Sequence, residues 1–219
     1  MNLANKLTLS RFAMVPLFVA LLEVDDMGFS APWRLTGLTA ALGVFVAAMI
    51  TDYYDGVLAR RHGYVTNFGR LMDPLADKLI VASAFVVFVG DGIVPAWMAI
   101  VILCREFLIT GLRLLGTSRG RIIQADLWGK NKAALQMAAI VAALVFLIAR
   151  DALEPRGLWA EIRIGGAGLD FWMRGVLWVL LYGAVVLTLV SGGLYLWRNR
   201  DLLEGELQQG APHQGGEGE

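Results

Sequence analysis

The sequence predicts an all-α integral membrane protein, built as a bundle of six transmembrane helices. Two observations predict this class: the composition is too apolar for a soluble domain, and apolar stretches recur along the chain. Of the 219 residues, 57% are hydrophobic and 17% are charged, and the mean hydropathy is +0.60. A soluble domain of this length rarely carries so little charge, so the excess apolar surface requires lipid to cover it.

Six apolar stretches account for the predicted helices. Windows of roughly 19 residues identify segments that can cross about 30 Å of hydrocarbon. In chain order these are residues 7–22, 35–59, 71–89, 94–115, 133–149 and 171–197. They follow one another so closely that no separate soluble domain fits between them. We therefore expect residues 1–203 to form one transmembrane domain.

The first stretch has an alternative interpretation as a secretory signal, because a basic start at Lys6 precedes a short apolar core. No small-x-small cleavage site follows before Glu23, Asp25 and Asp26. A retained helix is therefore the favoured interpretation. The end of the second stretch and the start of the third both carry aspartates, and the fourth stretch contains Arg105.

Basic residues predict the orientation of the bundle. With a cytoplasmic amino terminus, 13 of the 19 Lys and Arg residues fall on the cytoplasmic side and 5 on the other, while Arg105 lies inside a stretch. Cytoplasmic loops of membrane proteins carry this excess, so both termini are predicted to be inside. Residues 204–219 are rich in Gly, Glu and Gln and predict a disordered cytoplasmic tail.

The longest loop on the far side spans residues 151–170. Its Leu158, Trp159 and Ile162 are compatible with a short helix on the membrane surface.

Four aspartates form the most informative motif. Asp52 and Asp55 are three apart at the end of the second stretch, and Asp73 and Asp77 are four apart at the start of the third. Both spacings place the two carboxylates of a pair on one helical face. The loop 61–68 is short enough to make the two helices antiparallel neighbours. The sequence therefore predicts a pocket of four carboxylates.

Such a pocket requires cations. Four carboxylates at close range would repel by several kcal/mol, and some would protonate, unless cations share the site. Mg²⁺ and Mn²⁺ favour oxygen ligands, and two such ions a few ångströms apart can clamp a phosphoryl group during displacement. The predicted cofactors are two divalent cations, Mg²⁺ or Mn²⁺.

The residues beside the aspartates favour a pyrophosphate ligand. Gly56 and Ala59 leave room for a substrate to approach the backbone, and Arg60 adds a positive charge. In the structural alternative, the aspartates cap helix ends or pair with nearby Arg and Lys residues. Capping or pairing accounts for one or two aspartates more easily than for four on facing helices.

The spacing D-x2-D-G-x2-A-R-x8-G-x3-D-x3-D resembles the signature of the CDP-alcohol phosphatidyltransferase family. The sequence has all eight fixed positions: Asp52, Asp55, Gly56, Ala59, Arg60, Gly69, Asp73 and Asp77. The resemblance implies a six-helix catalytic bundle and a homodimer. It also implies a bacterial inner membrane location, with the site open to the cytoplasmic leaflet.

The resemblance also implies roles for individual residues. Asp52, Asp55 and Asp73 would hold the two metals, while Asp77 would contact one of them and act as the general base. The attacking hydroxyl would displace CMP from the lipid phosphorus of CDP-diacylglycerol without a covalent enzyme intermediate. Binding of the CDP-lipid is assigned to Asn5, Thr8, Gly56, Ala59, Arg60 and Gly69.

Three flanking segments resemble the phosphatidylglycerophosphate synthases of this family. They are N-x-x-T-x-x-R from Asn5, R-E-x5-L-R from Arg105, and G-K-x-K followed by Gln-Met from Gly129. Ala4 and Ala133 depart from the usual proline and threonine. This resemblance implies sn-glycerol 3-phosphate as the acceptor. A cluster of cations would hold such a dianion, and the predicted phosphate-binding residues are Arg105, Arg113, Lys130 and Lys132.

Alternatives remain for these cations and for the acceptor. Lys130 and Lys132 also fit ordinary positive-inside topology, and Arg105 can simply pair with Glu106. A cardiolipin synthase, or a synthase that uses inositol phosphate or serine, would keep the aspartates and change the acceptor pocket. A transporter would instead place its charges near the bilayer midplane in broken helices.

Overall fold

The structure is a computed structural model that describes residues 3–24, 31–62, 67–118 and 127–200. Side chains are described for a smaller set, which excludes most of residues 52–77 and also residues 3–9 and 127–131. The predicted tail, 204–219, lies outside the described residues.

Six long helices dominate the described chain: α1 (Leu3–Leu22), α2 (Ala31–His62), α3 (Asn67–Gly90), α4 (Ala96–Ser118), α5 (Leu127–Leu153) and α7 (Leu169–Arg198). Between α5 and α7 lie a 3-10 turn η1 (Glu154–Arg156), a short helix α6 (Leu158–Glu161) and two short strands, β1 (Arg163–Ile164) and β2 (Ala167–Gly168). The predicted all-α class is confirmed.

Each predicted apolar stretch coincides with one long helix, and the helices extend beyond the stretches at every end except the end of α1 and the start of α4. The largest difference is at α5, which begins at Leu127 where the apolar stretch begins at 133. The first turns of α5 include Lys130 and Lys132. A hydropathy window detects only the apolar part of a helix, so it misses the polar turns at this end.

Three helical segments within the described residues are long and apolar enough to cross a membrane: Trp33–Thr51, Lys132–Arg156 and Leu169–Arg198. Two shorter apolar segments are Ser10–Leu22 and Lys78–Gly90. Helix α4 carries three charged residues, Arg105, Glu106 and Arg113, along its length. The described residues thus support a membrane protein with three helices that meet the length and hydropathy of a membrane span. That all six long helices cross the membrane remains a prediction.

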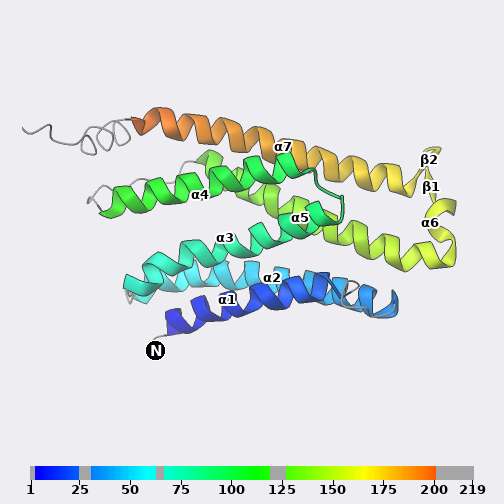
Figure 1. Cartoon of the computed structure of the whole chain (residues 1–219), viewed down its shortest axis with the longest axis horizontal. Helices are drawn as coiled ribbons and strands as arrows, with labels where there is room; N and C mark the ends of the chain where they lie inside the picture. Colours follow the sequence, from blue (N-terminus) through cyan, green and yellow to red (C-terminus); the bar gives the residue numbers. More distant parts are fainter. Residues whose placement is uncertain (1–2, 25–30, 63–66, 119–126, 201–219) are drawn as a thin grey trace, which may run out of the picture.

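The long helices run side by side in alternating directions (Figure 1). Helix α1 packs on α2 and α3, α5 packs on α2 and α7, and α4 packs on α3 and α7. The start of α1 and the end of α7 lie at the same end of the bundle (Figure 1). The prediction that both termini lie on one side of the membrane requires this arrangement.

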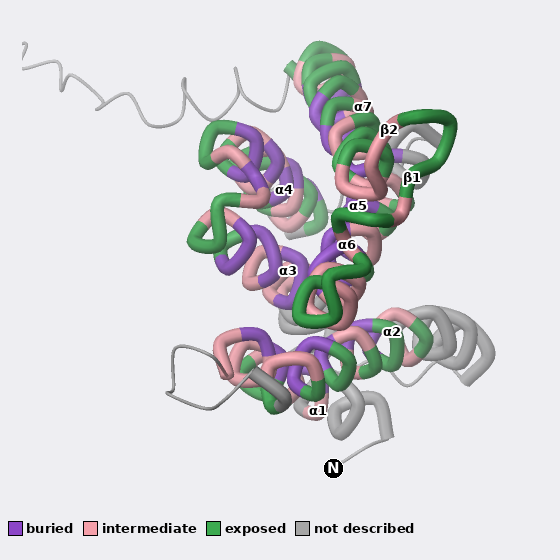
Figure 2. Tube along the Cα trace, turned by 90° about the vertical axis from the view of Figure 1, so that its right-hand side faces the viewer, coloured by how far each residue is buried: buried purple, intermediate pink, exposed green. Residues whose placement is uncertain are grey.

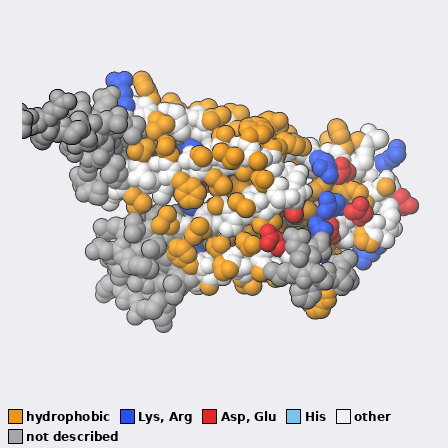
Figure 3. Space-filling view, in the orientation of Figure 1, with side chains coloured by type: hydrophobic (Ala, Val, Ile, Leu, Met, Phe, Trp, Pro, Cys, Tyr) orange, Lys and Arg blue, Asp and Glu red, His pale blue; other side chains and the backbone are white. Residues whose placement is uncertain are grey.

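Buried residues follow the inward faces of these helices (Figure 2). Phe18 of α1 and Phe45 of α2 are almost fully buried, with ring centroids 5.8 Å apart. The outward faces remain apolar, as at Val86, Val179 and Leu189, which are 62%, 72% and 59% exposed. In the face drawn in Figure 3, hydrophobic side chains cover the middle of the bundle. Such a surface suits contact with lipid.

The connection between α5 and α7 is ordered by short-range contacts. The short helix expected in the 151–170 loop is present as α6. Its Trp159 packs edge-on against Phe146, with ring centroids 5.9 Å apart. The two strands pair in an antiparallel hairpin. Gly165 and Gly166 form its turn with φ of 59° and 86°, a backbone region that glycine adopts without strain. Arg34 Nε lies 2.9 Å from Asp151 Oδ2, which links α2 to α5.

The crossing of α1 and α2 depends on a buried glycine. A Cβ on Gly37 would lie 2.5 Å from the carbonyl oxygen of Leu21 and 3.0 Å from Val24 Cγ2. Because a backbone oxygen cannot move aside cheaply, Gly37→Ala is expected to lower stability by about 1–3 kcal/mol. The measurement is the midpoint of thermal unfolding in detergent.

Gly43→Ala is the matched control for Gly37→Ala. Gly43 lies on the same helix, and no atom lies within 4 Å of its added Cβ. Its midpoint should equal or exceed that of the wild type, because alanine favours helix more than glycine. Equal midpoints for the two variants would contradict the close approach of α1 and α2 at Gly37.

Candidate active site

The four aspartates lie on two helices joined by a short connection. Asp52 and Asp55 belong to α2, and Asp73 and Asp77 belong to α3. The backbone is helical at all four positions. The prediction that each pair shares one helical face requires this. Five residue steps separate the end of α2 at His62 from the start of α3, so these helix ends lie within about 18 Å of each other.

The aspartate side chains lie outside the described residues, so the predicted four-carboxylate pocket is not tested by the structure. The same holds for the predicted CDP-lipid residues Asn5, Thr8, Gly56, Ala59, Arg60 and Gly69, and for Lys130. Among the side chains that the structure does describe, no three His, Cys, Asp or Glu residues come together.

A buried charge cluster centred on Glu106 lies where α3, α4 and α5 meet. Glu106 is 5% exposed and Lys132 is 2% exposed. Glu106 Oε1 accepts a hydrogen bond from Lys132 Nζ of α5, and its Oε2 lies 3.1 Å from Lys78 Nζ of α3. Arg105 Nη1 is 3.7 Å from Oε1. One carboxylate therefore contacts cationic side chains from three helices.

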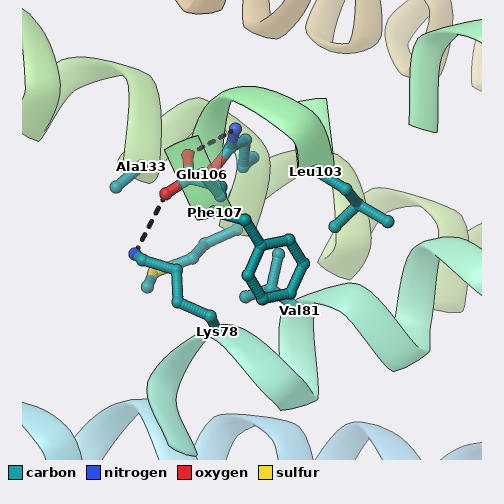
Figure 4. Close-up of a pocket in the computed structure, with 8 residues that line it drawn as sticks. Lys78, Val81, Leu103, Glu106, Phe107 and Ala133 are labelled. Carbon is teal, nitrogen blue, oxygen red and sulfur yellow. Dashed lines mark hydrogen bonds and ion pairs between the residues drawn. The ribbon is translucent and has the colours of Figure 1, made fainter. Parts of the chain in front are cut away.

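Helix α7 joins this cluster through an amide. Gln136 Nε2 of α5 lies 3.4 Å from Glu106 Oε1 and 3.4 Å from Thr188 Oγ1. Gln136 and Thr188 are both buried. A small pocket of about 30 Å³ lies beside the carboxylate, with Lys78, Glu106 and Gln136 on its polar side. Figure 4 shows Lys78 and Glu106 pointing toward each other across it, with Phe107, Val81 and Leu103 nearby.

Arg105 extends toward α7. A Cβ added to Gly192 would lie 3.0 Å from Arg105 Cγ, so the glycine gives the arginine stem its space. Arg105 Nε and Tyr195 Oη are buried and have no hydrogen-bond partner among the side chains that the structure describes. Arg113 and Tyr195 both lie within electrostatic range of the Arg105 guanidinium. Arg105 therefore lies between α4 and α7, with a second arginine nearby.

The sequence matches the CDP-alcohol phosphatidyltransferase family over residues 1–190. The chain belongs to this family. It is 36% identical over 212 residues to the CDP-diacylglycerol–glycerol-3-phosphate 3-phosphatidyltransferase of Bacillus subtilis, a match that covers 93% of this chain and 97% of the relative. An enzyme of the same name from Mycoplasma pneumoniae is 33% identical over 205 residues, covering 89% and 86% of the two chains.

A third relative is a probable phosphatidylglycerophosphate synthase of Mycobacterium tuberculosis, 42% identical over 139 residues that make up 64% of each chain. The family match includes α1 to α5 and most of α7. The predicted resemblance to the CDP-alcohol phosphatidyltransferase family is therefore confirmed over most of the bundle.

Within this family bundle, the structure brings two of the four predicted acceptor residues together. Arg105 and Lys132 both lie at Glu106, whereas Arg113 is exposed. The pairing of Arg105 with Glu106, considered as an alternative, is present at 3.7 Å. Sequence reasoning did not identify Lys78, Gln136 and Thr188 as members of the cluster. The available signal was a set of polar residues within apolar helices.

Proposed function

We propose that this protein transfers the phosphatidyl group of CDP-diacylglycerol to sn-glycerol 3-phosphate, giving phosphatidylglycerophosphate and CMP. The similarity to the Bacillus subtilis enzyme carries the proposal, because it extends over 97% of that relative, whose name specifies both substrates. The chain is accordingly a CDP-diacylglycerol-dependent phosphatidyltransferase of phospholipid biosynthesis.

The donor set fits two divalent cations. Asp52, Asp55, Asp73 and Asp77 supply only carboxylate oxygens, which Mg²⁺ and Mn²⁺ prefer. They come from helix ends that the short connection keeps close. When bound, the ions would neutralise the carboxylates and the developing charge on the pyrophosphate.

The protein side of the reaction is a direct displacement. Asp77 accepts the proton of the acceptor hydroxyl as that oxygen forms a bond to the lipid phosphorus. The bond between this phosphorus and the CMP oxygen breaks in the same step, and CMP leaves with the electron pair. Asn5 and Thr8 of α1, together with Gly56, Ala59, Arg60 and Gly69, would hold the CDP-lipid in line for attack.

Cations on α4 and α5 suit the acceptor. Its phosphate is a dianion, and we assign its binding to Arg105, Arg113, Lys130 and Lys132, where charge-assisted hydrogen bonds would orient the free hydroxyl toward Asp77. The described members of this group support the assignment, because Arg105 and Lys132 converge on one buried cluster and Arg113 lies within electrostatic range of Arg105.

The placement in the cell follows from the same arguments. We propose that all six long helices of residues 1–203 span the membrane, with the aspartates facing the cytoplasm and residues 204–219 as a disordered cytoplasmic tail. The excess of Lys and Arg at that end supports this orientation. A bacterial inner membrane and a homodimer complete the proposal.

The experiment that tests this function measures CMP release from CDP-diacylglycerol by the purified protein with each acceptor added in turn. The acceptors are sn-glycerol 3-phosphate, inositol phosphate, serine and phosphatidylglycerol. We expect only glycerol 3-phosphate to stimulate release, with phosphatidylglycerophosphate as the lipid product. If another acceptor stimulates CMP release and glycerol 3-phosphate does not, the acceptor assignment is wrong. If no acceptor stimulates CMP release, the proposal that the protein is a phosphatidyltransferase is refuted.

A further inference from the structure

Glu106 is the most connected buried charge among the described side chains, and the mechanism above gives it no role. Its two carboxylate oxygens serve different helices: Oε2 lies 3.1 Å from Lys78 Nζ of α3, and Oε1 accepts from Lys132 Nζ of α5. We propose that Glu106 is a positioning residue, which holds the acceptor-binding cations at a fixed distance from the helix that bears Asp77. This proposal rests on the proposed function.

The two lysines lie next to the two halves of the reaction. Lys78 directly follows Asp77 in α3, and Lys132 belongs to the cations assigned to the acceptor phosphate. A carboxylate that contacts both lysines fixes the separation of α3 and α5 at this level. The attacking hydroxyl must reach Asp77 while the phosphate is held by the cations, so a shift of about 1 Å in this separation is enough to impair attack.

Glu106 acts through the lysines because a negative charge in direct contact with the phosphate dianion would repel it. The residue is also buried, at 5% exposure, and its two oxygens already contact Lys78 and Lys132. Its influence on the acceptor therefore passes through its cationic partners.

Neighbouring helices fix the carboxylate itself. Gln136 Nε2 lies 3.4 Å from Glu106 Oε1 and 3.4 Å from Thr188 of α7, and Arg105 Nη1 lies 3.7 Å from the same oxygen. Side chains of α3, α4 and α5 therefore contact this carboxylate, and Gln136 links it to α7. Outer contacts of this kind orient the groups that touch the ligand, as second partners do for metal-bound histidines.

The test is Glu106→Gln, which keeps the shape of the side chain and removes its charge. The KM for glycerol 3-phosphate is expected to rise about 10- to 100-fold, while the KM for CDP-diacylglycerol stays within about twofold. Glu154→Gln is the matched control. Glu154 begins η1, just beyond the other end of α5; its side chain is 65% exposed and contacts only Arg150, at 3.9 Å, among the described ion pairs. Its two KM values should equal those of the wild type.

Two results would overturn the proposal. One is an unchanged KM for glycerol 3-phosphate in Glu106→Gln. The other is a parallel loss of kcat and of affinity for both substrates that follows the fraction of folded protein, as a purely structural role requires. If the amide variant does not fold, Glu106→Asp replaces it. That variant keeps the charge and shortens the reach by one methylene, so the acceptor KM should rise alone, and an unchanged KM would overturn the proposal.

The wild-type assay separates this proposal from the proposed function. If the wild type uses a different acceptor, the acceptor assignment fails, and the same variants are compared with that acceptor. A selective rise in its KM would then support the positioning role, and an unchanged KM would overturn it. A wild type that releases CMP with none of the acceptors would overturn both proposals.

Discussion

Asp77→Asn is expected to lower kcat by about 10²- to 10⁴-fold, which is the usual contribution of a general base. The amide has nearly the shape of the carboxylate but cannot accept the proton of the attacking hydroxyl. Binding of CDP-diacylglycerol should persist, because three aspartates remain for the cations. The two measurements are single-turnover CMP release and equilibrium binding of labelled CDP-diacylglycerol in detergent micelles.

Asp170→Asn is the matched control for this substitution. Asp170 lies in the first turn of α7, at the other end of the bundle, where it pairs with Arg174 at 2.9 Å. Its turnover should match that of the wild type. A near-normal kcat in Asp77→Asn would remove Asp77 from the role of general base. A simultaneous loss of CDP-lipid binding would mean that Asp77 is needed mainly to hold the ligand.

Asp52→Asn is expected to lose turnover and divalent-ion affinity together. Its carboxylate is assigned to the metals alone, and the amide carries no charge, so the apparent Mg²⁺ or Mn²⁺ affinity should fall by about 10- to 100-fold. Activity measured against metal concentration should therefore shift to higher concentration in Asp52→Asn. Asp77→Asn should show a smaller shift, because Asp77 is assigned to only one of the two metals.

The contrast between the two variants separates the assigned roles. Saturating metal should restore part of the activity of Asp52→Asn and none of that of Asp77→Asn, because added metal cannot replace the lost general base. Equal metal dependence and near-normal rates in both variants would refute the assigned roles. Asp170→Asn again serves as the control for removal of one carboxylate.

The positions of the long helices could be predicted because apolar length is a strong signal. The stretch 94–115 predicts α4, which the structure places at Ala96–Ser118. The hairpin of Arg163–Ile164 and Ala167–Gly168 was not predicted. Its strands have two residues each, too few to show alternation, although the Gly165–Gly166 pair between them is a turn signal.

The Glu106 cluster was predictable only in part. Arg105 and Glu106 are recognisable as charges within an apolar stretch, where a partner is expected. Which partner they have depends on how α3, α4, α5 and α7 rotate against one another. That rotation is determined by packing across the bundle and not by local spacing. The contact of Glu106 with Lys132, and the link from Gln136 to Thr188, therefore required the structure.

The family assignment needed no tertiary information because its signature is local. All eight fixed positions fall between Asp52 and Asp77, on two helices with a short connection. The family match over residues 1–190 and the similarity to the Bacillus subtilis enzyme confirm this prediction. The metal and substrate roles of the same residues remain predictions, since their side chains lie outside the described part of the chain.

We propose that divalent ions neutralise the carboxylates on α2 and α3 and thereby bind the pyrophosphate of the lipid. Titration of Mn²⁺ into the purified protein with CDP-diacylglycerol, followed by electron paramagnetic resonance, counts the bound ions directly. We expect two ions per chain in the wild type and none when all four aspartates are changed to asparagine. Wild-type protein that binds no Mn²⁺, or a fourfold variant that binds as much as the wild type, would contradict it.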